Sequence, residues 1–249
     1  MAVRRFLVDN NKGPVFQITK SRTICLMDAT GSMANVLQKC KNCVQTMFQR
    51  AYAVLRSKGF PEGVFELQFA VYRNYSSSIH EILQKSTWES KPEHLKAFMD
   101  SIQVSGGLGN EAVEIGFAHV NDELLSGDVS QVILIGDMPP NTREEVAAHR
   151  SIYNHWEGTK YYMPTYFKDE LEKMKSRAVV VHAFYVNSHA MRKFESIAQM
   201  MGGTCSELDI DSPNGADMLT AIVTEYIIII IIIIIDYILI PHSHSNSNK

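Results

Sequence analysis

The chain has 249 residues, of which 45% are hydrophobic and 20% are charged, and its formal net charge is -3. These proportions are those of a globular protein and exclude a disordered or collagen-like chain. The basic residues are scattered and form no stripe, so we expect no nucleic-acid partner.

Short apolar runs alternate with segments of helical spacing. The run over 23–27 (TICLM) ends in Asp28, and apolar residues over 36–55 then recur every three or four positions, as on one face of a helix. The run over 129–135 (VSQVILI) is followed by a second acid, Asp137. The other predicted elements are strands over 64–72, 79–83, 178–186 and 205–208, and helices over 92–102, 112–125, 142–156, 167–175, 188–201 and 214–224.

Strands that alternate with helices predict an α/β fold with a central, mostly parallel sheet and helices on both faces. We expect this domain over residues 21–225, after an N-terminal extension over 1–20. Residues 226–249 form a poly-isoleucine segment and a polar tail.

The two acids that follow buried strands indicate a ligand site, because open sheets of this kind bind ligands beyond the carboxyl ends of their strands. Asp28, Thr30 and Ser32 occupy alternate positions after the first strand, so their oxygens can converge on one point. Oxygen donors suit Mg²⁺ or Mn²⁺, and Asp137 would add another. The alternative for the first loop is that one of these side chains caps the next helix.

Three motifs resemble the metal-binding loops of von Willebrand factor A (VWA) domains. ICLMDATGSMANVLQKCK resembles the first motif, D-x-[ST]-x-S, SGGLGNEA looks like the second loop, and VILIGDMPPN is similar to the third. The resemblance covers residues 21–208 and is closest to VWA domains attached to α-kinases. It implies a Rossmann-like VWA fold with a metal-ion-dependent adhesion site. No kinase domain is present in this sequence, so we expect no kinase activity.

The resemblance also implies roles for individual residues. Thr30 and Ser32 would bind the metal through their hydroxyls, and Asp28 and Asp137 would bind it directly or through water. A vacant coordination position would accept an acidic side chain from a partner protein. The family's second loop usually supplies a threonine, whereas this loop offers only Asn110 or Glu111.

Glu111 has two interpretations from sequence. It either faces the metal or stabilises the first turn of the following helix. In the first case the site becomes more negative, so it should hold a metal more tightly and accept an acidic ligand less readily.

We therefore expect a divalent-metal-dependent protein-binding module that works in intracellular interaction or signalling and is not an enzyme. One alternative is a metal-dependent phosphohydrolase with Asp28 as nucleophile. Against it, Thr30 stands where such an enzyme would place a second Asp, and the histidines are scattered. The other alternative is an interaction domain whose metal site is degenerate.

Two further patterns have more ordinary explanations. Residues 107–112 match G-x-G-x-x-A, but a dinucleotide site needs a strand directly before the glycines, and a helix is predicted there. Cys40-x-x-Cys43 lies within a long amphipathic helix, so we expect core packing and no redox pair. We expect Cys25 and Cys205 to be core residues as well.

Residues 227–235 are an unbroken isoleucine run, and Asp236 interrupts the apolar stretch that continues to Ile240. The stretch is short for a membrane span, so a tail anchor is disfavoured. The run either extends the last helix or strand onto the core or is a low-complexity chain end, and we favour the chain end. The first residues contain no apolar run of the length of a secretory signal, so we expect a cytoplasmic protein.

Overall fold

The computed structural model describes residues 20–61, 63–107, 109–153 and 156–239. Six strands form one sheet in the order β3-β2-β1-β4-β5-β6. All neighbouring strands are parallel except β3, which runs antiparallel to β2. The mostly parallel sheet is confirmed. The strands are β1 (Ser21–Asp28), β2 (Phe65–Tyr72), β3 (Leu83–Lys85), β4 (Gln131–Gly136), β5 (Val180–Tyr185) and β6 (Cys205–Glu207).

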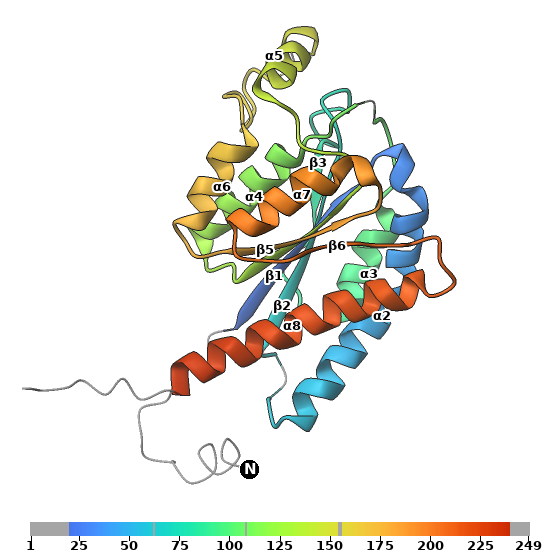
Figure 1. Ribbon diagram of the computed structural model, residues 1–249, viewed down its shortest axis with the longest axis vertical. Helices are drawn as coiled ribbons and strands as arrows, with labels where there is room; N and C mark the ends of the chain where they lie inside the picture. The colour runs from blue at the N-terminus through green and yellow to red at the C-terminus, as the bar shows by residue number, and fades with distance from the viewer. Residues whose placement is uncertain (1–19, 62, 108, 154–155, 240–249) are drawn as a thin grey trace, which may run out of the picture.

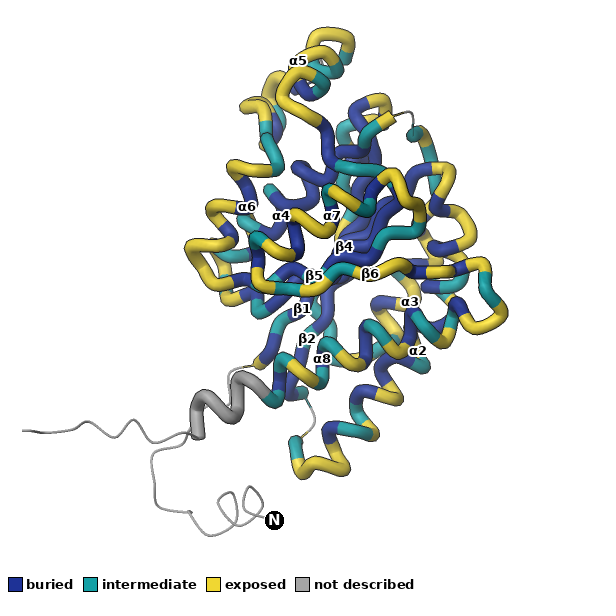
Figure 2. Tube along the Cα trace, in the orientation of Figure 1, coloured by how far each residue is buried: buried dark blue, intermediate teal, exposed yellow. Residues whose placement is uncertain are grey.

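Helices cover both faces of this sheet (Figure 1). Helices α4, α6 and α7 pack on one face, and α2, α3 and α8 pack on the other. Figure 2 shows the strands buried between these layers while the outward helix surfaces are exposed. The helices are α2 (Ala34–Ser57), α3 (Pro92–Ser101), α4 (Val113–Ser126), α5 (Arg143–Ile152), α6 (Phe167–Lys175), α7 (Ser188–Met200) and α8 (Gly215–Leu239), and a short 3-10 helix, η1 (Gly31–Met33), precedes α2.

The first strand shows why these residues form a central strand. Its side chains alternate between the two faces of the sheet. Cys25 and Met27 enter the core under α2, α3 and α8, whereas Ile24 and Leu26 enter the core under α4, α6 and α7. A strand that is buried on both faces needs an uninterrupted apolar run, which explains the TICLM signal.

Two predicted elements differ from the structure. Residues 79–83, predicted as a strand, are mostly a turn, and β3 begins only at Leu83. The helix predicted over 142–156 ends at Ile152. Trp156 instead packs edge-on against Tyr75, with ring centroids 5.3 Å apart, in a third apolar cluster beneath α5. At Trp156 this tertiary contact overrides the local helical pattern.

The last helix is much longer than the predicted 214–224, because it continues through the isoleucine run to Leu239. Ile227 and Ile231, one turn apart, are 1% and 2% exposed in the core shared with α2. The preference for a low-complexity chain end is therefore wrong for this part of the run, which extends the last helix onto the core. The expected domain boundary at residue 225 falls inside α8.

By length and composition alone, Gly215–Ile232 would also suit a membrane span, and 39% of this window is buried inside the protein. Core helices of soluble proteins meet the same criterion, so the finding is weak evidence for a membrane. The N-terminal extension, apart from Lys20, and the polar tail from Ile240 onward lie outside the described residues.

All four cysteines are free, and Cys25, Cys40 and Cys43 are buried in one apolar cluster. Core packing of the Cys40–Cys43 pair is thus confirmed. Cys205 is only partly buried, at the edge strand β6. The glycines over 107–112 follow α3 and a loop, so the strand that a dinucleotide site requires is missing from the described residues before them.

Candidate metal centre

The two acids predicted from strand ends lie at the same edge of the sheet. Asp28 is the last residue of β1, and Asp137 directly follows β4, the strand beside β1. Met27 pairs with Ile135 in the parallel ladder, so the two chains leave the sheet almost level with each other. Both acids are buried, with Asp28 0% and Asp137 7% exposed. Parallel pairing of these neighbouring strands therefore brings the two carboxyl groups together.

The first loop folds back on its own acid. The main-chain N–H of Thr30 donates to Asp28 Oδ1 over 2.7 Å, and the hydroxyls of Thr30 and Ser32 are 3.3 Å apart. Neither η1 nor α2 receives a side-chain cap at its start, which does not support the capping alternative for this loop. Thr30 is fully buried and Ser32 is exposed, so the group of oxygens opens to solvent on the Ser32 side.

The second loop lies against the first and brings Glu111 into the same place. Its backbone bonds the first loop twice, from Gly31 N–H to Gly106 O and from Ser105 N–H to Ala29 O, each 3.1 Å long. Gly107 has a φ of 99°, and a β-carbon there would lie 2.7 Å from Thr30 Cβ and 3.2 Å from Glu111 Oε1. Glycine at this position therefore allows the glutamate side chain to lie beside the first loop.

Glu111 is tied to the third loop through its main chain. Its N–H donates to Pro139 O over 3.0 Å, and its carbonyl accepts from Asn141 N–H over 3.2 Å. Helix α4 begins two residues later, at Val113, so Glu111 lies outside the first helical turn. Its side chain is 2% exposed and is repelled by Asp28 and Asp137. These contacts favour the metal-facing interpretation of Glu111.

Asn110, the other candidate from the second loop, has different contacts. Its side-chain nitrogen, Nδ2, donates to both carboxylate oxygens of Glu145, over 2.8 and 3.1 Å. Its main-chain carbonyl accepts from Asn74 Nδ2. Glu145 in turn closes a capping box with Thr142 at the start of α5. Asn110 thus joins the second loop to α5, and we leave it out of the candidate ligand set.

Burial and neighbouring carboxyl groups destabilise the ionised forms of Asp28 and Glu111. Burial, reinforced by the charge of Asp137, raises the pKa of Asp28 to about 8 against the opposing hydrogen bond from Thr30. Burial and repulsion by Asp28, Asp137 and Glu114 raise the pKa of Glu111 to about 9. A divalent cation among these groups would reverse this effect, because it favours the charged carboxylates.

The carboxyl groups of Asp28, Glu111 and Asp137 each have one buried oxygen without a hydrogen-bond partner among the described residues. These atoms are Asp28 Oδ2, Glu111 Oε2 and Asp137 Oδ1. Buried polar atoms are nearly always bonded, so these three oxygens are available to a ligand from outside the chain. Hard carboxylate and hydroxyl oxygens match Mg²⁺ or Mn²⁺ in donor chemistry. The residues present therefore fit the expected metal ion.

Among the described residues, acidic, His and Cys side chains do not form a metal-binding group by themselves. Within the described residues, no group of three or more of them is arranged to hold a metal ion. The set described above needs the hydroxyls of Thr30 and Ser32 as donors as well, and Mg²⁺ also retains water molecules.

A layer of residues behind the carboxyl groups was missed from sequence. The Tyr72 hydroxyl lies so close to Gly136 that a β-carbon on the glycine would come within 2.6 Å of it. Burial and the nearby carboxyl groups raise the pKa of Tyr72. Glu114 Oε1 accepts from Asn141 Nδ2 over 3.1 Å, and burial raises the pKa of Glu114 to about 8. A glutamate within the apolar stretch AVEIGF was the available signal for this layer.

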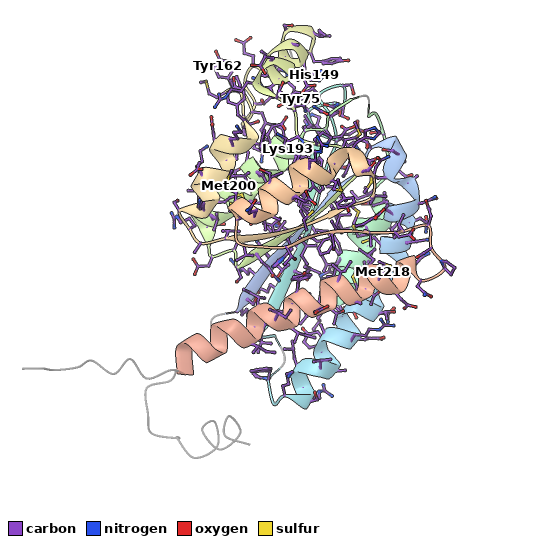
Figure 3. All side chains as sticks on the ribbon, in the orientation of Figure 1. Tyr75, His149, Tyr162, Lys193, Met200 and Met218 are labelled. Atoms are coloured by element: carbon purple, nitrogen blue, oxygen red, sulfur yellow. The ribbon has the colours of Figure 1, made fainter. Side chains whose placement is uncertain are left out.

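Helix α5 lies beyond the edge of the sheet at which β1 and β4 end (Figure 3). Tyr75, which follows β2, stacks on His149 of α5 with ring centroids 5.5 Å apart and an interplanar angle of 5°. The exposed side chain of Tyr162 lies near the tip of the same projection. This stacked contact therefore ties α5 to the segment that follows β2.

No family model and no curated protein matches the sequence. Solved structures do match the fold. A von Willebrand factor type A protein from Catenulispora acidiphila aligns with a TM-score of 0.57 and 10% identity over 84% of this chain and 43% of that chain. The pilus adhesin SpaC from Lactobacillus rhamnosus GG, in its open conformation, aligns with a TM-score of 0.57 and 12% identity over 85% and 30%. Proximal thread matrix protein 1 from the mussel byssus aligns with a TM-score of 0.53 and 14% identity over 84% and 46%.

The chain thus spans less than half the length of each of these structures. At such identities the likeness concerns the fold alone. It confirms the expected Rossmann-like α/β fold of the VWA type, with a mostly parallel sheet between two layers of helices.

Proposed function

We propose that this chain is a divalent-cation-dependent protein-binding module that acts inside the cell and is not an enzyme. The cation is Mg²⁺ or Mn²⁺, and its ligands come from Asp28, Thr30, Ser32, Glu111 and Asp137. The observation that carries the proposal is that Asp28, Glu111 and Asp137 each hold a buried carboxylate oxygen without a hydrogen-bond partner among the described residues.

The energetics support a cation more than a structural polar cluster. Buried ionised groups are costly unless they are paired, and here Asp137 raises the cost of ionising Asp28, while Asp28 and Asp137 raise that of ionising Glu111. The charge of Asp28 acts on Arg73, whose guanidinium donates to the main-chain carbonyls of Glu81 and Gln103. A cation among the carboxyl groups would add its positive charge to that of Arg73.

The geometry also supports a role in binding. The cluster is open to solvent at Ser32, so a bound cation could be reached by a group of another protein. Two of the structures with this fold carry the names of an adhesin and of a thread matrix protein. The resemblance to α-kinase-associated domains adds the proposal that the module serves intracellular signalling.

Catalysis has less support from the site. A phosphohydrolase of the aspartyl-phosphate kind needs an acid two positions after its nucleophile, and that position holds Thr30. The buried histidine nearest in sequence to the second loop, His119, is on α4 and is bonded to Gln68 of β2. An interaction domain with a degenerate metal site is the remaining alternative.

Calorimetric titration of Mg²⁺ and Mn²⁺ into the full chain tests the proposal. We expect saturable binding by the unaltered protein, which Asp137→Ala abolishes. The matched control is Asp128→Ala, because Asp128 is exposed and precedes the same strand at its opposite end. Absence of binding to the unaltered protein would refute metal dependence and leave the degenerate-site alternative. Equal loss in both variants would show that the effect is not specific to the site.

A further inference from the structure

A polar cavity of about 250 Å³ lies beside the third loop, between the starts of α5 and α6 and the middle of α7. Residues 142–144 and 166–168 line it, together with Lys193 of α7, which Figure 3 labels. Asn141, four residues after Asp137, lines it as well. The candidate metal ligands, all of them described, are not among the lining residues. The cavity is therefore a neighbour of the candidate metal centre and is separate from it.

Positive charge exceeds negative charge on the lining of this cavity. Three basic residues line it, Arg143, Lys168 and Lys193, whereas Glu144 is the one acid among the described lining residues. Asp169 binds the Arg143 guanidinium over 2.5 and 2.7 Å and balances its charge. Lys168 is exposed and pairs with no described residue. The two lysines thus outweigh Glu144, and the cavity favours an anionic group.

Two aromatic side chains at the start of α6 hold cations in the cavity wall. Arg143 Cζ lies 4.0 Å from the centre of the Tyr166 ring, and Lys193 Nζ lies 5.3 Å from the centre of the Phe167 ring. Both distances are within the range of about 6 Å over which cation–π attraction acts. A side chain held in this way loses less freedom when it meets a ligand. The cavity is therefore partly organised for an anion in advance.

Asn141 adds a hydrogen-bond acceptor to the same cavity. Its side chain is 1% exposed, and its Nδ2 donates to Glu114 Oε1 over 3.1 Å. Its Oδ1 is buried and has no hydrogen-bond partner within the described part of the chain. A buried carbonyl oxygen needs a donor, which a carboxylate by itself does not supply. The ligand that suits this cavity therefore combines an N–H donor with an acidic group.

We propose that the cavity binds an acidic peptide segment of the protein partner. The side-chain carboxylate of one residue of the segment meets Lys168 and Lys193, and the main-chain N–H of that residue donates to Asn141 Oδ1. Pockets for drug-sized ligands begin at about 300 Å³, so this smaller cavity suits one residue of a partner better than a free cofactor. The inference rests on the proposed role in protein binding but does not depend on the cation.

Nuclear magnetic resonance of the full nitrogen-15-labelled chain, with a chelator present, tests the proposal. The probe is the tripeptide Gly-Glu-Gly, blocked at both ends. We expect saturable shifts of the amide signals of residues 142–144 and 166–168. Lys168→Gln should weaken binding about three- to fivefold, and Lys193→Gln should do the same and guards against misfolding of one variant. The matched control is Lys175→Gln, because Lys175 is also exposed on α6 but lies in its last turn. It should bind like the unaltered protein.

Changes to the probe test the two parts of the ligand. A probe with Gln in place of Glu should not bind measurably, and equal binding would overturn the acidic group. An ester in place of the Gly-Glu amide removes the N–H and should weaken binding about fivefold. Inorganic phosphate that binds as tightly as the tripeptide would overturn the peptide segment and leave a general anion site.

The remaining outcomes separate this inference from the proposed function. Equal weakening in Lys175→Gln would overturn the assignment to the cavity. Absence of probe binding by a protein that binds Mg²⁺ in calorimetry overturns this inference alone. Probe binding by a protein that binds neither Mg²⁺ nor Mn²⁺ supports this inference and overturns the metal dependence of the proposed function.

Discussion

Gly107 lies so close to Thr30 that a β-carbon on the glycine would come within 2.7 Å of the Thr30 β-carbon. This close approach allows the second loop to lie against the first, with the Glu111 carboxyl group beside Thr30. The φ of Gly107, 99°, is also one that other residues rarely adopt.

Gly107→Ala should therefore destabilise the protein for two reasons, strain in the backbone and a clash with Thr30. We expect a loss of about 2–4 kcal/mol in the free energy of unfolding, measured by urea denaturation. Gly109→Ala is the matched control, because Gly109 also has a positive φ of 82° but has open space around its β-position. It should lose only about 1 kcal/mol. Equal losses in the two variants would show that the Thr30 contact is unimportant.

Asp28→Asn should abolish binding of the cation while the fold is retained. The substitution removes a buried charge that Asp137 repels, and the remaining side-chain oxygen can still accept from Thr30 N–H. In the absence of metal, the stability at pH 8 should be unchanged or higher by about 1 kcal/mol. Calorimetry and thermal unfolding in the presence of a chelator measure the two effects. Unfolding of the variant would mean that Asp28 has a structural role that does not depend on metal.

The metal-free protein should lose stability as the pH rises. Asp28, Glu111 and Glu114 have pKa values of about 8, 9 and 8 in the folded protein, whereas those of unfolded carboxyl groups are about 4. Between these values the unfolded chain has released its protons and the folded chain still holds them. The contribution of each group to stability is therefore present below about pH 4 and is lost as the pH rises toward 8 or 9.

A cation should offset this loss, because it binds the ionised carboxylates. We expect Mg²⁺ to raise the melting temperature more at pH 8.5 than at pH 6, by several degrees for a domain of this size. Thermal unfolding with Mg²⁺ or with a chelator at both pH values measures the difference. A shift that is independent of pH, or one that persists in Asp28→Asn, would contradict the assignment of these carboxyl groups.

The isoleucine run should matter for stability only on its core side. Ile227 is 1% exposed and Ile229 is 39% exposed, although both are surrounded by the same residue type. Ile227→Ala should cost about 2–4 kcal/mol because it leaves a cavity beneath α8, and Ile229→Ala should cost less than about 1 kcal/mol. Urea denaturation of the full chain measures both. Small and equal effects would show that α8 does not pack on the core in solution.

The sequence alone determined the elements whose signals are local. Buried parallel strands must be apolar on both faces, so TICLM and VILI identified β1 and β4, and the acids Asp28 and Asp137 followed from the strand ends. Alternation of strand and helix then predicted the α/β architecture. The motifs of the first and third loops predicted the VWA-type fold, because their residues are contiguous in the chain.

Only the tertiary structure decided what depends on contacts between distant segments. Asn110 and Glu111 are neighbours in sequence but have different contacts. Asn110 pairs with Glu145, whereas the close approach of Gly107 to Thr30 allows Glu111 to lie beside the first loop. Burial of Ile227 depends on α2, which lies far earlier in the chain, so composition alone could not reveal it. Local pattern fixes which face of an element is apolar, whereas the neighbours of each side chain are fixed only when the elements pack together.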